Sequence, residues 1–340
     1  MKRFLAFVLM LCFLPLSGAF CLEKEELPPA LYIGQMRLSG KVFEDWEGVD
    51  GIHHINTIPE KAWIKIHALY PTFALVSYDD GRIFGFVKRI CIDQTRPVDN
   101  STTPPYGVEF NHFIAKIGAK DAPVTTLPGG GETLITLHEG AKISFIGFEN
   151  GYAKIIYHRQ YAYIDSRLLC DLVNVYESPE DAGDDAPIAS YTSFYKITTD
   201  ESNLNRMVNI DVACRKLRAL TFPPESALDF NKQIGPYSAK EGYLPATVLV
   251  DGGSKQGYGG GTCQVSSTLY NVVLQLPGLY VIQRRAHGGN GASYLPIGVD
   301  AAVGNSSLNF RFRNKYPFPI RIDATAQDGA LTLAIYKITE

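Results

Sequence analysis

The chain has 340 residues, a length that usually corresponds to two or three domains. Hydrophobic residues make up 46% and charged residues 20%, which indicates a folded protein and excludes a wholly disordered one. The formal net charge of −3 argues against the broad basic surface that nucleic-acid binding requires, so no nucleic-acid partner is expected.

Residues 1–19 have the order of a secretory signal peptide. Lys2 and Arg3 precede an apolar run over residues 4–16, and small residues end at Ala19. The run is too short to span a bilayer comfortably, so no stable transmembrane anchor is expected. We predict cleavage after Ala19 and a secreted or extracytoplasmic protein at the cell envelope. An uncleaved tether and a lipid anchor on Cys21 are the alternatives.

Two stretches, residues 31–92 and 113–170, look like repeats rich in short β-strands. Each contains a strong hairpin signal near its end, Asp80-Gly81 in the first and Asn150-Gly151 in the second. The second hairpin is expected to join strands at 142–146 and 152–156.

Both stretches resemble bacterial SH3-like domains, because Gly85-Phe86-Val87 and Ala162-Tyr163-Ile164 stand where that family has its closing strand. The resemblance implies two small five-stranded barrels, at residues 25–95 and 108–172. It also implies cell-wall peptides or glycans as ligands, and barrels that serve only as spacers are the alternative.

Removal of the signal peptide would leave an odd number of cysteines: Cys21, Cys91, Cys170, Cys214 and Cys263. In an oxidising compartment this implies at least one unpaired thiol or an intermolecular bond. A disulfide between Cys91 and Cys170 and two free thiols are both open. No CxxC pair occurs, and the sequence predicts no metal site and no cofactor.

An acidic segment follows, in which residues 177–187 include five acids, two prolines and one glycine. Such a composition does not build a core, so residues 173–189 are predicted to be a linker. The C-terminal domain is expected over residues 190–340.

This domain should begin with a helix over residues 203–220, which ends before Pro223. Its inward face would carry Met207, Ile210, Cys214 and Leu217. Cys214 is therefore predicted to be a core residue.

A glycine-rich loop opens a second helix, with Thr262 as the expected N-cap and Cys263 in the first turn. A thiol at this position faces the positive end of the helix dipole, which favours the thiolate. Binding residues are expected around it: the glycines would let a substrate approach the thiol, and Gln264 or loop N–H groups would stabilise an oxyanion. The predicted binding residues are Gly259, Gly260, Gly261 and Gln264.

Residues 191–338 resemble the VanW family. The blocks that carry the resemblance are Gly259 to Asn271, Glu241-Gly242-Tyr243, His287, Tyr294-Leu295-Pro296, Gly298 to Ala301 and Phe310 to Asn314. The family takes its name from a gene in some glycopeptide-resistance clusters. The resemblance therefore implies an envelope setting but no particular reaction.

Within these blocks, Cys263, His287 and Asp300 follow the order nucleophile, base and orienting acid found in papain-like enzymes. One hypothesis is a cysteine-dependent hydrolase or acyltransferase that acts on cell-wall peptides. The other is a binding or assembly module in which Cys263 is a small buried residue. The predicted fold is mixed, with two all-β barrels followed by an α+β domain, and peptidoglycan or its peptides are the expected partners.

Overall fold

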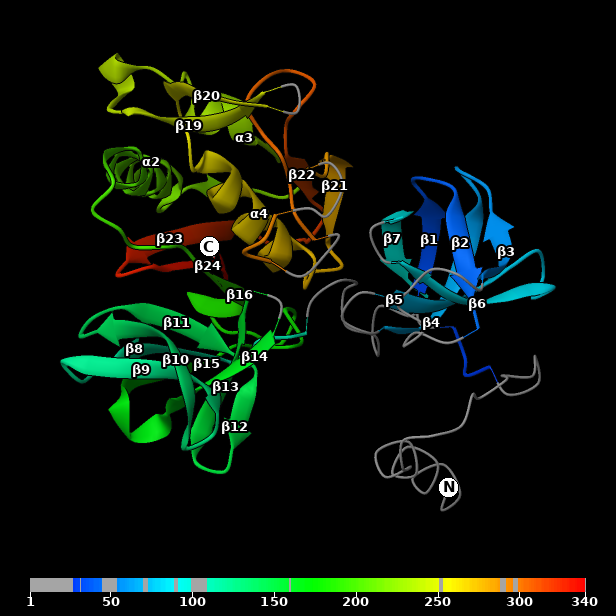
Figure 1. Cartoon of the computed structure of the whole chain (residues 1–340), viewed down its shortest axis with the longest axis horizontal. Helices are drawn as coiled ribbons and strands as arrows, with labels where there is room; N and C mark the ends of the chain where they lie inside the picture. The colour runs from blue at the N-terminus through cyan, green and yellow to red at the C-terminus, as the bar shows by residue number, and fades with distance from the viewer. Residues whose placement is uncertain are drawn as a thin grey trace.

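The computed structural model describes residues 27–30, 32–44, 54–69, 73–88, 91–98, 109–158, 160–250, 253–287, 292–295 and 299–339. This part of the chain is mixed but mostly β-sheet, with few helices (Figure 1). The predicted signal peptide and Cys21 lie outside it. None of the helices in the described ranges is both long and apolar enough to cross a membrane.

The first β unit is a seven-stranded antiparallel sheet with the order β3-β2-β6-β5-β4-β1-β7. Its strands are β1 (Tyr32–Met36), β2 (Gly40–Phe43), β3 (His54–Ile58), β4 (Trp63–Leu69), β5 (Phe73–Tyr78), β6 (Ile83–Lys88) and β7 (Ile92–Pro97). The predicted hairpin at Asp80-Gly81 is confirmed, because β5 pairs with β6 and both turn residues have positive φ angles.

The second β unit consists of a five-stranded sheet, β10-β9-β14-β13-β12, and a three-stranded sheet, β11-β8-β15. Its elements are β8 (Phe113–Ile117), β9 (Asp121–Leu127), β10 (Gly130–His138), β11 (Lys142–Phe145), β12 (Gly147–Glu149), β13 (Tyr152–Tyr157), β14 (Gln160–Asp165), the 3-10 helix η3 (Ser166–Leu168) and β15 (Leu169–Asn174). The turn at Asn150-Gly151 joins β12 to β13. The predicted strand 142–146 is instead β11, which pairs with β8.

The two SH3-like barrels are not confirmed. Over the residues that the structure describes, the strands form sheets with free edges rather than a closed barrel. The hairpin signals were sufficient to place turns. How non-adjacent strands pair depends on side chains that are distant in sequence, and the local pattern does not contain that information.

The C-terminal domain is built on a four-stranded sheet, β16-β24-β23-β17, with two smaller sheets, β18-β22-β21 and β19-β20. Its strands are β16 (Ala186–Phe194), β17 (Thr221–Phe222), β18 (Ala227–Asp229), β19 (Pro245–Val250), β20 (Gly253–Tyr258), β21 (Leu279–Gln283), β22 (Arg311–Asn314), β23 (Ile320–Gln327) and β24 (Ala330–Lys337). The helices are α2 (Glu201–Leu217), α3 (Phe230–Ile234), the 3-10 helix η4 (Ala239–Glu241) and α4 (Thr262–Val273). Helices α2 and α4 pack against the four-stranded sheet and each other (Figure 1).

Helix α2 follows its predicted pattern. Asp200 caps it, and its carboxylate accepts the backbone N–H of Asn203 at 3.0 Å. Ile210, Cys214 and Leu217 are fully buried in the core, which confirms the predicted inward face.

The acidic segment is packed against the C-terminal domain, which corrects its interpretation as a linker. Lys337 Nζ donates to the Glu180 carbonyl at 2.7 Å, and the backbone N–H of Thr339 donates to Asp184 Oδ1 at 2.7 Å. Ala182 is buried, and strand β16 already begins at Ala186. One backbone carbonyl and one carboxylate of this segment therefore bind residues near the end of the chain, which composition alone does not reveal.

The second β unit shares buried contacts with the four-stranded sheet. The backbone N–H of Ser144 donates to Thr192 Oγ1 at 2.7 Å, and Thr332 Oγ1 donates to the Lys142 carbonyl at 2.6 Å. Lys142 also forms an ion pair with Asp323 at 2.7 Å. These two parts of the chain therefore share one packed interface.

Candidate active site

Helix α4 begins in the glycine-rich loop. Its N-cap is Gly261, whose φ of 104° is unfavourable for residues with a side chain. Thr262, the predicted N-cap, is instead the first helical residue, and its hydroxyl donates to the Gly259 carbonyl at 2.8 Å. Cys263 lies in the first turn, as the sequence predicts.

The three glycines of this loop allow close packing. A Cβ atom at Gly259 would lie 2.7 Å from the Tyr237 ring, and one at Gly260 would lie 2.7 Å from the Thr247 carbonyl oxygen. At Gly261 it would lie 2.9 Å from Cγ of Arg206. These contacts fix the start of α4 against the β19-β20 hairpin and α2. A role of the glycines in binding stays a prediction.

The buried polar side chains of α4 hold the segment that carries Asp300. Ser266 Oγ donates to the Ala301 carbonyl at 2.6 Å, and Ser267 Oγ accepts the Ala301 N–H at 2.9 Å. Asn271 Nδ2 donates to the Val299 carbonyl at 2.6 Å. The residues on both sides of Asp300 are thus hydrogen-bonded to α4. Because Cys263 also belongs to α4, these bonds fix the position of Asp300 relative to Cys263.

Asp300 binds His287 twice. Its Oδ2 atom accepts the ring Nδ1 at 2.6 Å and the backbone N–H of His287 at 2.5 Å. Because an ionised carboxylate only accepts hydrogen bonds, Nδ1 is the donor, and this leaves Nε2 for another partner. Asp300 is 1% exposed, so this pairing is shielded from water.

Arg284 is the second partner of Asp300. Its Nε donates to the Asp300 carbonyl at 2.7 Å, and its Nη2 lies 3.5 Å from Oδ1. The guanidinium also packs 4.9 Å from the centre of the Tyr270 ring. The Arg284 side chain is only 3% exposed. Arg284 directly follows β21, and the Asp300 carboxylate balances its charge.

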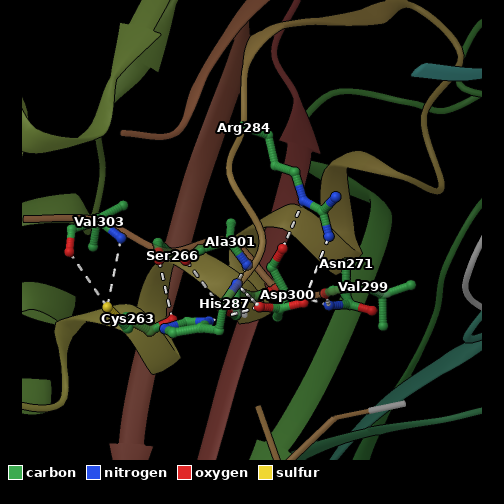
Figure 2. A network of polar contacts seen from close by, with 10 residues as sticks. Cys263, Ser266, Asn271, Arg284, His287, Val299, Asp300, Ala301 and Val303 are labelled. Atoms are coloured by element: carbon green, nitrogen blue, oxygen red, sulfur yellow. Dashed lines mark hydrogen bonds and ion pairs between the residues drawn. The ribbon is translucent and has the colours of Figure 1, made fainter. Parts of the chain in front are cut away.

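His287 lies between Asp300 and Cys263 (Figure 2). Burial opposes its charge, but hydrogen bonds to Asp300 and Cys263, together with their negative charges, raise the pKa of His287 to about 10. Burial likewise opposes the charge on Asp300, but its bonds to His287 and the charge of Arg284 lower the pKa of that carboxyl. The geometry therefore favours a protonated imidazolium.

Other groups also surround the Cys263 thiol. Its Sγ lies 3.5 Å from the N–H and 3.4 Å from the carbonyl oxygen of Val303 (Figure 2). Tyr237 and Tyr294 are also neighbours of Cys263, and burial is the largest cause that raises the pKa of each phenol. The thiol is half-buried, so it is neither sealed in the core nor fully exposed.

Gln264 is not available as an oxyanion donor. Its Nε2 donates to Ser193 Oγ at 3.0 Å and to the Phe194 carbonyl at 3.1 Å, and its Oε1 accepts from Arg206. With 1% of its surface exposed, it is a buried bridge between β16 and α2. The sequence prediction failed here because adjacency to Cys263 does not tell on which side of the helix Gln264 lies.

The remaining described cysteines are separate free thiols. Cys214 is buried in the core, Cys91 is half-buried, and Cys170 is exposed. In the described ranges, no three His, Cys, Asp or Glu side chains form a group that could hold a metal ion.

The polar side chains that position this site were not predicted from the sequence. Ser266, Ser267 and Asn271 lie in α4, between its apolar residues. A signal was present, because Ser, Thr and Asn are unfavourable inside helices unless they make specific hydrogen bonds. Arg206 gave no comparable signal, since an arginine in an amphipathic helix is usually a solvated residue.

The comparisons with known proteins agree with the family resemblance. Residues 205–336 match the model of the family described as VanW like protein. The chain is 27% identical over 274 residues to YoaR of Bacillus subtilis (strain 168), itself uncharacterized; the match covers 78% of this chain and 86% of YoaR.

Two solved structures also match, NlpC1 and NlpC2 from Trichomonas vaginalis, at 11% and 10% identity. The matches cover 96% and 92% of this chain and 99% of each structure, but the TM-score is 0.17 in both cases. At this score they say nothing about the fold of this chain. The family match is independent of them: residues 205–336 form a VanW-like domain.

Proposed function

We propose that the C-terminal domain is a cysteine-dependent hydrolase or acyltransferase, with Cys263 as nucleophile, His287 as acid and base, and Asp300 as the residue that orients His287. The observation that carries this proposal is the position of His287 between a buried carboxylate and a thiol at a helix N-terminus (Figure 2).

The reaction would begin with attack of the Cys263 thiolate on the carbonyl carbon of an amide. The tetrahedral oxyanion collapses to a thioester, and the protonated His287 gives its proton to the departing amine. His287 then takes a proton from water, which attacks the thioester, releases the carboxylic acid and regenerates the thiol group. An acceptor amine in place of water gives a new amide instead.

In this proposal the backbone N–H of Cys263 is the oxyanion donor. It belongs to the second residue of α4, and the first N–H groups of a helix have no partner within the helix. The helix dipole adds to this stabilisation. This N–H takes the role that the sequence suggested for Gln264.

We propose amides of peptidoglycan stem peptides as the substrate class, at the cell envelope. The signal-like order of residues 1–19 supports export. The two N-terminal β units would bind the cell wall, as their resemblance to SH3-like domains suggests.

A groove in the first β unit favours a second candidate function, the binding of wall peptides without catalysis. Its lining combines apolar and polar groups, as peptide-binding grooves do. The lining residues are Glu44, Ile55, Asn56, Arg82, Ile83, Phe84 and Gly85. In that case Cys263 would be dispensable for binding.

Alkylation of the folded protein tests the nucleophile. The exposed thiol of Cys170 serves as an internal reference for an ordinary cysteine. Iodoacetamide at pH 6 should modify Cys263 at least tenfold faster than Cys170, measured by mass spectrometry, and His287→Gln should remove most of this difference. Equal rates for the two cysteines, or a Cys263 that reacts only after denaturation, would contradict the proposal.

Loss of activity is the second arm of this test. Purified stem-peptide fragments should be cleaved or transferred by the wild-type protein and not by Cys263→Ala. Cys170→Ala should retain the wild-type activity.

A further inference from the structure

Arg206 lies beside the candidate nucleophile although it comes from a different helix. It stands in α2, where its Cγ and carbonyl oxygen approach Gly261 so closely that only glycine fits there. Its guanidinium donates to Gln264 Oε1. Because residues 261 and 264 flank Cys263 in the first turn of α4, Arg206 contacts both sides of the turn that carries the thiol.

The orientation of Arg206 is fixed. Gln264 accepts this bond with Oε1 while its Nε2 donates to Ser193 and Phe194, and these bonds hold the amide in one orientation. A single bond to Gln264 leaves other N–H groups of the guanidinium available, and the side chain is half-buried rather than enclosed. A guanidinium held in this way can receive a planar anion with two parallel hydrogen bonds.

In the described part of the chain, no carboxylate balances the charge of Arg206. Among the described residues, no Asp or Glu forms an ion pair with it, whereas Arg284 faces Asp300. Its ionisable neighbours are instead Tyr294, Tyr195 and Cys263. A half-buried cation without a counter-ion is unfavourable, so the site as it stands is short of one negative charge.

We propose that Arg206 binds a carboxylate of the substrate, next to the amide that Cys263 attacks. This inference rests on the proposed function and narrows it to peptides in which a free carboxylate lies within about one residue of the reacting amide. Such a group is found at a peptide C-terminus or on an acidic side chain. Arg206 is thus a specificity residue rather than part of the proton-transfer machinery.

Two alkylating reagents of similar size separate this role from a general effect on the thiol. Iodoacetate carries a carboxylate and iodoacetamide does not, while both form the same bond with sulfur. If Arg206 binds carboxylates, Arg206→Met should lower the ratio of the iodoacetate rate to the iodoacetamide rate at Cys263 by about tenfold. Arg206→Lys should lower it less, since it keeps the charge and loses the planar fork.

Arg215→Met is the matched control. It lies in the same helix and pairs with Asp211 on the surface, so it should leave the ratio unchanged. If Arg206 only balances the thiolate, Arg206→Met slows both reagents equally and the ratio stays constant, which would overturn the inference while leaving the nucleophile intact. If neither reagent modifies Cys263 in the folded protein, the proposed function fails together with the inference.

A measurement on the wild-type protein makes the test independent of the folding of any variant. N-acetylglycine, which has a free carboxylate, should protect Cys263 from iodoacetamide in a saturable manner. N-acetylglycinamide should not protect it at the same concentration. Equal protection by both compounds, or by neither, would overturn the carboxylate site.

Discussion

Helices α2 and α4 each carry a cysteine, and the two residues have opposite surroundings. Cys214 in α2 is fully buried among apolar side chains, and burial raises the pKa of its thiol. Cys263 in α4 is half-buried beside a histidine, two tyrosines and an arginine. A cysteine in a helix is therefore informative only together with its position along that helix and its polar neighbours.

The two helices also bury polar residues to different extents. Helix α2 is amphipathic, and its polar side is turned to solvent, as in Arg215 and Asp211. In helix α4 nearly every side chain is buried, including six polar ones that each make a hydrogen bond: Thr262, Gln264, Ser266, Ser267, Thr268 and Asn271. Buried polar networks specify one geometry, because each unmatched group costs free energy. A site that holds three side chains in a fixed relative geometry requires such a network.

The largest loss of stability is expected from Asp300→Ala, which removes a residue held by the polar side chains of α4. The substitution leaves the buried Arg284 without its carboxylate, and we expect a loss of about 3–5 kcal/mol in the free energy of unfolding, measured by urea denaturation. Asp211→Ala removes the carboxylate of an exposed pair on α2 and should cost less than about 0.5 kcal/mol. Similar losses for both would mean that the network around α4 adds little stability.

A smaller effect is expected from Gly260→Ala. The new methyl group would meet the backbone of β19 at 2.7 Å and displace the start of α4, at a cost of about 1–3 kcal/mol. It should also slow the alkylation of Cys263. Gly147→Ala has no atom within 4 Å of the new methyl group and serves as the control. A stable variant with an unchanged alkylation rate would show that the tight loop does not position the thiol.

The free energy of unfolding should depend on pH because His287, next to Cys263, is protonated in the folded protein. The pKa of His287 is about 10 in the folded protein, above the 6.5 of an ordinary histidine. The protonated pair therefore stabilises the fold fully below about pH 6.5, and this contribution is lost as the pH rises through about 10. Between these values the free energy of unfolding should fall by up to about 1.4 kcal/mol per pH unit more than in His287→Gln. Parallel curves for the two proteins would contradict a charged His287.

The smallest changes in stability are expected from substitution of the two cysteines, and they compare Cys214 with Cys263 directly. Cys214→Ala removes a fully buried sulfur and should cost about 1 kcal/mol, as other small deletions in a core do. Cys263→Ala should change the free energy of unfolding by less than that, while it abolishes the fast alkylation. If Cys263→Ala were the more destabilising of the two, Cys263 would be chiefly a structural residue.

Much of the C-terminal domain could be predicted from local patterns. The apolar spacing placed α2, the glycine-rich loop placed the start of α4, and the order of Cys263, His287 and Asp300 suggested that the three side chains meet. The partners of these residues could not be predicted. Whether Arg284 lies in water or against Asp300 depends on how β21 approaches the 299–303 segment, and no local pattern contains that information.

In the N-terminal half, local patterns predicted the turns but not how the strands pair into sheets. Turn residues such as Asn150 and Gly151 located the hairpins, because positive φ angles demand particular residue types. The pairing of strands across a sheet has no such residue code, so the closed barrels expected there did not follow. The acidic segment was misjudged for a related reason, because its partners Lys337 and Thr339 lie at the other end of the chain.

The interface between the second β unit and the four-stranded sheet bears on how such domains are exchanged in evolution. Phe194 and Ala330 of the C-terminal domain belong to the core of the second β unit. A gene fusion that attached a different module at residue 190 would leave both side chains uncovered, and with them the hydroxyl of Thr192. Recombination would therefore have to transfer this β unit and the VanW-like domain as a single inherited piece.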